Sequence, residues 1–113
     1  MIVAAPCPEG VARSHPEIVC FAGREPEAIE AMIRAGKIPD LTAGALALAW
    51  ANARKHARVA LVAQGIKDEE ARALGFVPYG AVQEALDEAL ARHGRGAKVS
   101  VLPFAPDTLP IVK

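Results

Sequence analysis

Hydrophobic positions along the chain predict three β-strands. Residues 2–5 form a short apolar run that Pro6 ends, and residues 58–63 form a nearly unbroken one. Apolar runs of this length are typical of parallel strands that are covered on both faces. In residues 98–102 polar and apolar side chains alternate, which indicates a strand near the edge of a sheet. We therefore expect two buried strands, with 58–63 at the centre, and one edge strand.

Apolar positions at helical spacing predict four helices. Residues 26–35 begin with proline and are followed by glycine, while residues 41–56 follow Asp40, a residue type that caps helices. A short helix is expected with Asp68 as its cap, and residues 81–93 form a helix between two glycines. The expected buried faces are Ile29, Met32 and Ile33 in the first helix, Leu41, Ala45, Leu48 and Ala49 in the second, and Val82, Ala85, Leu86, Ala89 and Leu90 in the last.

Strands and helices alternate along the chain, and this order predicts the fold class. Parallel strands need crossovers between them, and the crossover helices pack on the faces of the sheet. We therefore expect a single α/β domain over residues 1–113, with a small parallel, Rossmann-like sheet and helices on both faces. The first loop (residues 6–16) and the tail (residues 103–113) contain three prolines each and are expected to be irregular.

The composition limits the size of the core. Hydrophobic residues make up 52% of the chain, but 24 of its 113 residues are alanine and only 4% are aromatic. The core should therefore be thin, and its three strands leave two sheet edges to be covered. We expect the chain to self-associate as a dimer or to bind another subunit. Val99, Val101 and the alanine-rich surface around Trp50 are the expected contact regions.

The balanced charge argues against nucleic acid as a partner. Thirteen basic and thirteen acidic side chains cancel, whereas nucleic-acid binding needs a concentrated basic surface. The densest basic cluster consists of Arg54, Lys55, His56 and Arg58. We expect it to be a solvated helix end, where cations suit the helix dipole.

Apolar length and cysteine content bear on the compartment. No apolar run approaches the roughly 20 residues that span a bilayer, and the first residues lack the charged start of a signal peptide. We therefore expect no membrane association. Cys7 and Cys20 alone do not form a disulfide framework, so reduced thiols and a cytoplasmic location are expected.

The first loop is the strongest candidate for a binding site. Cys7, Glu9, Gly10 and His15 directly follow the first strand, and ligands of open parallel sheets bind beyond the carboxyl ends of the strands. The simpler interpretation is a turn shaped by proline and glycine, with Glu9 and His15 in solvent.

The residues of the first loop do not favour a metal site or a nucleophilic active site. The two cysteines are too far apart in sequence for a zinc motif and lack a clear fourth ligand. His15, His56 and His93 belong to a loop and two separate helix ends, so we expect no metal site and no nickel binding. A Cys7 nucleophile would need His15 as its base, and we assign no catalytic residue.

Three segments together resemble the C-terminal domain of the nickel-pincer-dependent lactate racemases. They are residues 2–10 (IVAAPCPEG), residues 58–65 (RVALVAQG) with a following acidic helix and LGF at 74–76, and residues 98–103 (KVSVLP) with TLP at 108–110. The resemblance covers nearly the whole chain in the same order. One departure is Ala12, which stands where the family usually has a second glycine.

The resemblance implies a racemase or epimerase of lactate or a similar 2-hydroxy acid. In that family a nickel pincer nucleotide takes up and returns the hydride, and the N-terminal domain supplies the residues that hold it and both histidine acid/bases. Those residues are not in this chain, so the resemblance implies that the chain binds no cofactor alone and depends on an N-terminal racemase-like domain or subunit. Glu9 and Gly10 are carried over only as candidates for lining the substrate cleft.

Two interpretations of function follow. In the first, the chain is the structural, cleft-closing C-terminal domain of a racemase-like protein and is not catalytic by itself. In the second, it is a free-standing binding or interaction module that has the fold without the racemase chemistry, because a fold does not fix a function.

Overall fold

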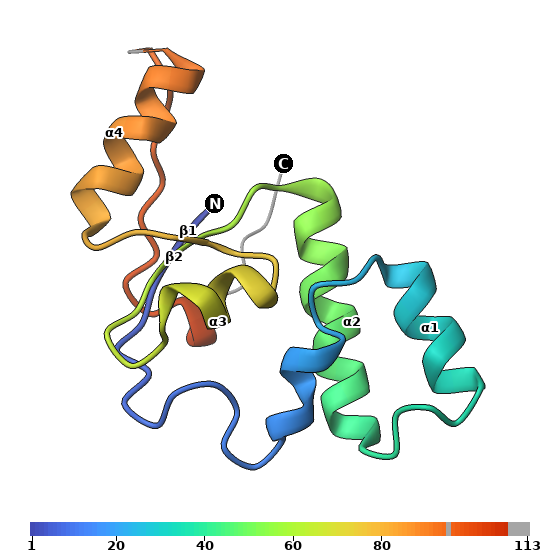
Figure 1. Cartoon of the computed structure of the whole chain (residues 1–113). Helices are drawn as coiled ribbons and strands as arrows, with labels where there is room; N and C mark the ends of the chain where they lie inside the picture. Colours follow the sequence, from blue (N-terminus) through green and yellow to red (C-terminus); the bar gives the residue numbers. More distant parts are fainter. Residues whose placement is uncertain (95, 109–113) are drawn as a thin grey trace.

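The computed structural model describes residues 1–94 and 96–108, which form an α/β fold with a three-stranded, all-parallel sheet and four α-helices (Figure 1). The elements in chain order are β1 (Ile2–Ala4), η1 (Pro16–Cys20), α1 (Pro26–Arg34), α2 (Leu41–His56), β2 (Ala60–Val62), α3 (Asp68–Ala73), β3 (Val77–Pro78), α4 (Val82–His93) and η2 (Ala105–Asp107). The predicted fold class is confirmed.

The sheet has the strand order β1-β2-β3, so β2 is central, as its apolar sequence predicts. Ile2 pairs with Ala60 on one side of β2, and Val77 pairs with Ala60 on the other. Figure 1 shows α2 and α4 on opposite sides of these strands. Because helices cover both faces of β2, its residues Ala60 and Leu61 are buried.

The third strand lies at residues 77–78, and its prediction at 98–102 was wrong. Pro78 would normally argue against a strand, but its neighbours make the ladder: the Val77 amide donates to the Val59 carbonyl (3.0 Å) and the Tyr79 amide to the Leu61 carbonyl (2.9 Å). Proline can occupy the intervening position on an edge strand, because that position needs no donor. Residues 98–102 are exposed and contain no strand.

Strand β1 is an exposed edge strand, and the prediction that it is buried was wrong. Val3 and Ala4 are both exposed, and Val3 keeps 37% of its surface in solvent. Since β1 pairs with β2 alone, its outer backbone edge has no neighbouring strand among the described residues. Strand order, which a local apolar run cannot report, decides this exposure.

The helix ends follow local capping chemistry. The Asp40 carboxylate accepts hydrogen bonds from the amides of Thr42 (2.9 Å) and Ala43 (3.1 Å), so the predicted cap of α2 is confirmed. At α3 the prediction needs a correction, because Asp68 is the first helical residue and Lys67 holds the cap position. There the Glu70 carboxylate accepts a hydrogen bond from the Lys67 amide (2.9 Å).

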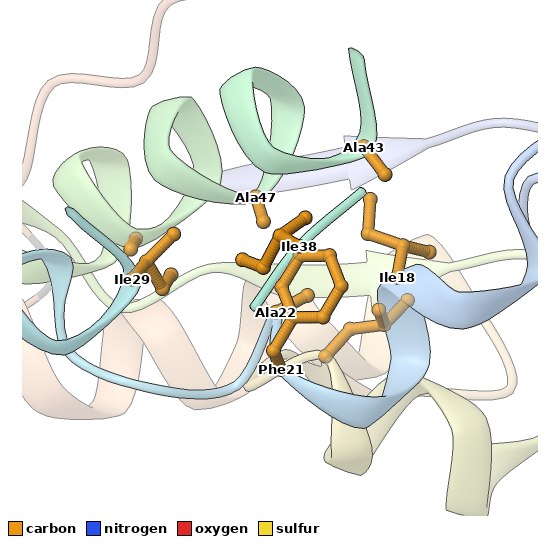
Figure 2. Close-up of a cluster of buried hydrophobic side chains, with 9 residues drawn as sticks. Ile18, Phe21, Ala22, Ile29, Ile38, Ala43 and Ala47 are labelled. Carbon is orange, nitrogen blue, oxygen red and sulfur yellow. The ribbon is translucent and has the colours of Figure 1, made fainter. Parts of the chain in front are cut away.

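The main core lies between η1, α1 and α2, to one side of the sheet (Figure 2). Its buried side chains are Ile18, Phe21, Ala22, Ile29, Ile38, Ala43, Ala47, Ala51 and Leu74. Gly44 allows a close helix contact, since a Cβ built there would lie 3.2 Å from the Ile33 side chain. Many of the buried residues of this core are alanines, as the alanine-rich composition predicts.

The buried face of α2 differs from the prediction. Ala43, Gly44, Ala47 and Ala51 are buried, whereas Leu41, Ala45 and Ala49 are exposed and Leu48 is half-buried. Apolar residues surround most of this helix, so the sequence has no unique apolar stripe to identify. In α4 the difference is smaller: Ala85 is buried, Leu86, Ala89 and Leu90 are half-buried, and Val82 is exposed.

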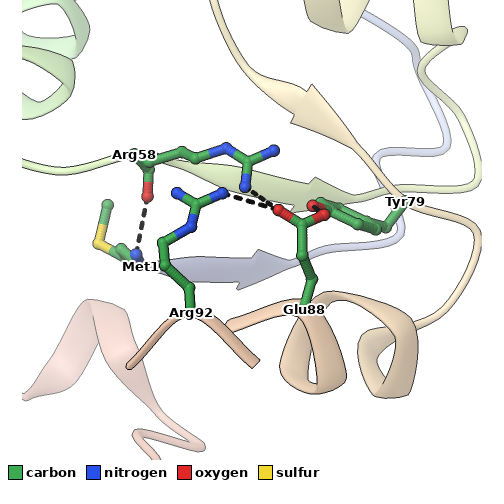
Figure 3. Close-up of polar contacts among 5 residues, drawn as sticks. All are labelled: Met1, Arg58, Tyr79, Glu88 and Arg92. Atoms are coloured by element: carbon green, nitrogen blue, oxygen red, sulfur yellow. Dashed lines mark hydrogen bonds and ion pairs between the residues drawn. The ribbon is translucent and has the colours of Figure 1, made fainter. Parts of the chain in front are cut away.

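A polar cluster joins α4 to the sheet (Figure 3). The Glu88 carboxylate accepts hydrogen bonds from Arg58, from the Tyr79 hydroxyl and from Arg92, the last at 2.8 Å. The Met1 amine also donates to the Arg58 carbonyl (2.8 Å). The cluster thereby connects the start of β1, the residues before β2 and after β3, and α4.

Candidate functional site

An apolar cavity of about 430 Å³ lies between the sheet, α2 and the first loop. Side chains alternate along a strand, so Met1, Val3 and Ala5, in and beside β1, face the same side. The other described lining residues are Cys7, Gly10, Val11 and Ala12 from the first loop, Leu46, Trp50 and Ala53 from α2, Val59 and Leu61 at β2, and Ile66, Leu74 and Phe76 beyond it.

Helix α2 lines the cavity with a second apolar face, separate from its core face. Leu46, Trp50 and Ala53 are spaced at i, i+4 and i+7, which places them on one side of the helix. The core-facing residues Ala43, Ala47 and Ala51 lie about a quarter turn away. The helix therefore faces the main core with one side and the cavity with another, which explains why it is apolar nearly all round.

Among the described residues that line the cavity, no side chain carries a charge. The one charged group on a described lining residue is the Met1 amine, which donates to the Arg58 carbonyl. Of the described lining side chains, the Cys7 thiol and the Trp50 indole N–H are the two with a polar hydrogen. The cavity is therefore suited to an apolar, uncharged occupant, because a charged group would lose its hydration without gaining a charged partner.

The first loop closes one end of the cavity in an unusual backbone conformation. Cys7 (φ 44°), Gly10 (φ 75°) and Ala12 (φ 39°) all have positive φ angles, and all three line the cavity. Positive φ costs little at glycine but is strained at cysteine and alanine. The Gly10 amide donates to the Cys7 carbonyl (2.9 Å), which closes a tight turn between them.

Gly65 holds the first loop against the segment after β2. Its amide donates to the Pro6 carbonyl (3.0 Å), and a Cβ built on it would lie only 1.8 Å from the Cys7 carbonyl oxygen. Only glycine fits so close an approach of two backbones. This contact helps to maintain the conformation of the loop beside the cavity.

An aromatic pair forms part of the cavity wall. The rings of Trp50 and Phe76 meet edge to face, with centroids 5.6 Å apart and planes at 64°. The Arg54 guanidinium lies over Phe76, 5.8 Å from the ring centroid, and donates to the carbonyls of Ala22 (2.6 Å) and Arg24 (3.1 Å). The half-buried Trp50 thus anchors the cavity side of α2.

The basic cluster at the end of α2 was predicted to be a solvated helix end, but the structure shows that its four side chains differ in their surroundings. Arg54 is partly buried, and this burial lowers its pKa from the usual value. Lys55 is exposed but forms an ion pair with Glu27 (2.5 Å), and Arg58 belongs to the polar cluster at α4. Only His56 of these four has no side-chain hydrogen bond or ion pair within the described part of the chain.

The structure separates the residues proposed from the first loop. Gly10 and Cys7 line the cavity, whereas Glu9 is exposed and is not among the lining residues. The His15 ring is half-buried and hydrogen-bonded to the Asp40 carboxylate, so the solvated interpretation of this residue was wrong. Cys7 and Cys20 are both free thiols.

The histidines lie in different parts of the molecule. His56 and His93 end α2 and α4, and both are exposed. Within residues 1–94 and 96–108, no three His, Cys, Asp or Glu side chains are grouped closely enough to hold a metal ion.

Sequence reasoning missed most of the cavity wall. The signals that could have identified it are the spacing of Leu46, Trp50 and Ala53 on α2 and the alternation of Val3, Ala5 and Cys7 along β1. Phe76 gave no such signal, because the turn after α3 brings it to the wall.

None of the helices in the described ranges has the length and apolar character needed to cross a bilayer.

Comparisons of the chain with protein-family models, with curated proteins and with solved structures gave no match.

Proposed function

We propose that this chain is a non-catalytic domain that closes over the cleft of a partner unit, and that the partner supplies 2-hydroxy acid racemase chemistry. The observation that supports a partner most directly is the open apolar surface at β1. This edge strand leaves Val3 exposed, and the apolar cavity opens beside it. Uncovered apolar surface next to an unpaired strand edge favours a protein interface.

The racemase part of the proposal is supported by the resemblance of three segments to the C-terminal domain of the nickel-pincer-dependent lactate racemases. In this proposal the partner holds the nickel pincer nucleotide and both acid/base histidines. Glu9 and Gly10 follow β1 at the carboxyl end of the sheet, where cleft-lining residues of parallel sheets occur. Exposed Glu9 would face the partner, and Gly10 would shape the turn that presents it.

Reconstitution tests this proposal. The chain would be mixed with the nickel-loaded N-terminal domain of a lactate racemase that lacks its own C-terminal domain, and lactate inversion followed by chiral chromatography. We expect a complex in size-exclusion chromatography and faster inversion than with the N-terminal domain alone. Glu9→Ala should reduce the gain, while Glu69→Ala, an exposed carboxylate on α3, serves as the matched control. Absence of both a complex and any gain in rate would contradict the proposal.

A second candidate is a free-standing binding module. The observation that favours it is the cavity, whose volume of about 430 Å³ lies within the range of small-molecule sites in proteins. A chain that binds a small molecule stoichiometrically without any partner protein would support this alternative. The two candidates differ in whether the chain needs a second protein to function.

A further inference from the structure

We infer that the cavity between β1, α2 and the first loop is a binding site for an uncharged, largely apolar small molecule that contains an aromatic ring. This inference rests on the second candidate function, the free-standing binding module, for which it names the class of ligand; it does not rest on the racemase proposal, which concerns a protein partner. It rests on the size of the cavity, the chemistry of its wall and the conformation of the first loop.

The size and chemistry of the cavity define the class of ligand. Its volume is about 430 Å³, and sites of this size bind drug-sized organic molecules. The described lining side chains come from β1, α2, β2, the first loop and the segments around α3, and none of these side chains is charged. An anion or a cation would therefore be desolvated without compensation, whereas an apolar molecule gains by leaving water.

The aromatic wall favours a ring in the ligand. Trp50 and Phe76 both line the cavity and already meet each other edge to face. A third ring can add to such a pair in the edge-to-face or offset geometry that aromatic groups prefer. The Cys7 thiol and the Trp50 indole N–H are the side-chain donors of the wall, so the ligand has room for one or two acceptor atoms.

The conformation of the first loop is a separate observation in support of a ligand. Cys7 and Ala12 are the two residues with positive φ that are not glycine in the described part of the chain, and both line this cavity. Strained backbone of this kind is concentrated at ligand sites, where the surrounding structure maintains it. Here the contact of Gly65 with Cys7 supplies that support.

Trp50 makes the inference testable without a known ligand. It is the only tryptophan of the chain and it lines the cavity, so its fluorescence reports on the site alone. The probe is N-phenylnaphthylamine, an uncharged aromatic molecule that becomes fluorescent in apolar surroundings. We expect saturable binding of one probe per chain, with quenching of Trp50 and energy transfer to the probe. Binding should also raise the unfolding temperature as the probe concentration rises.

Two pairs of variants locate the site. Ala53→Phe fills the cavity from α2, and Ala45→Phe places the same ring on an exposed position of the same helix outside the cavity. Leu46→Glu introduces a charge into the wall, and Leu41→Glu introduces it at an exposed position outside the wall. Both cavity variants should weaken probe binding at least about tenfold, since the phenylalanine occupies the space of the probe and the glutamate adds an unpaired charge. Both controls should bind like the unchanged protein.

Specific results would overturn the inference. Circular dichroism establishes whether each variant is folded. Ala53→Phe and Leu46→Glu test the site separately, so if one of them misfolds, the other still tests whether the probe binds in the cavity. Binding that is absent, does not saturate, or is equal in the cavity variants and their controls would refute the site. Probe release as the protein concentration rises would show that a second copy of the chain covers the cavity instead. Lactate inversion in the reconstitution experiment is unaffected by any of these outcomes, so the two proposals fail separately.

Discussion

The His15 ring in the first loop is hydrogen-bonded to the carboxylate of Asp40, the residue that caps helix α2. One carboxylate oxygen of Asp40 accepts the bond from the His15 ring, and the other accepts the amides of Thr42 and Ala43. Asp40 therefore holds the end of the first loop and the start of α2 at the same time.

Replacing Asp40 should separate these two roles. We expect Asp40→Ala to lower the unfolding temperature more than His15→Ala, because the first change removes the helix cap and the hydrogen bond to His15 together. Asp40→Asn retains an oxygen that can cap the helix and should fall between the two. Thermal unfolding followed by circular dichroism measures all three variants. Equal unfolding temperatures for Asp40→Ala and His15→Ala would show that the cap contributes nothing.

Stability should decrease in acid. The hydrogen bond from His15 holds the pKa of Asp40 below its ordinary value, and bonds from Lys55 and Tyr79 do the same for Glu27 and Glu88. A carboxyl with a lowered pKa in the folded state contributes stability above its unfolded pKa of about 4. That contribution is lost as the pH falls through the lower, folded-state value. Urea unfolding between neutral pH and about pH 3 should show this decline, with a shallower slope in Asp40→Asn.

Gly65 should not tolerate a side chain. A Cβ at this position would lie 1.8 Å from the Cys7 carbonyl oxygen, so Gly65→Ala must displace the first loop. We expect it to lower the free energy of unfolding by about 2–4 kcal/mol and to weaken probe binding in the cavity. Gly96→Ala is the control, because nothing lies within 4 Å of a Cβ at that glycine. Comparable stability of the two variants in urea unfolding would contradict the close contact.

The buried face of α2 can be verified by enlarging alanines. Ala47 is fully buried against the core, and Ala45 on the same helix is exposed. We expect Ala47→Leu to destabilise the fold by about 1–3 kcal/mol through overpacking. Ala45→Leu should change the free energy of unfolding by less than about 0.5 kcal/mol, as surface substitutions usually do. The opposite ranking would restore the buried face predicted from the sequence.

Self-association remains a prediction, and the fold indicates which surfaces would form the contact. The outer edge of β1 pairs with no other strand of the part of the chain that the structure describes, and Val99 and Val101 are 56% and 79% exposed. We expect a symmetric dimer, the commonest closed assembly, with a mass that depends on concentration in light scattering. Val3→Lys should weaken a dimer formed through β1, since lysine on an edge strand opposes pairing. A mass that stays monomeric at high micromolar concentration would exclude the dimer and favour the free-standing module.

The sequence alone determined the elements whose signals are local. The cap at Asp40, the proline at the start of α1 and the apolar run of β2 each act within a few residues, so the α/β class and the central strand were predictable. In the site, Cys7 and Gly10 were predictable as candidates because they follow β1 directly.

Tertiary structure decided what depends on neighbours distant in the sequence. The exposure of β1 follows from its place at the edge of the sheet, and β3 exists because Val77 and Tyr79 find partners on β2. The face of α2 that is buried was set by η1 and α1, since an apolar helix can bury more than one side. The cavity has the same origin, because its wall combines residues from Met1 to Phe76 that only packing brings together.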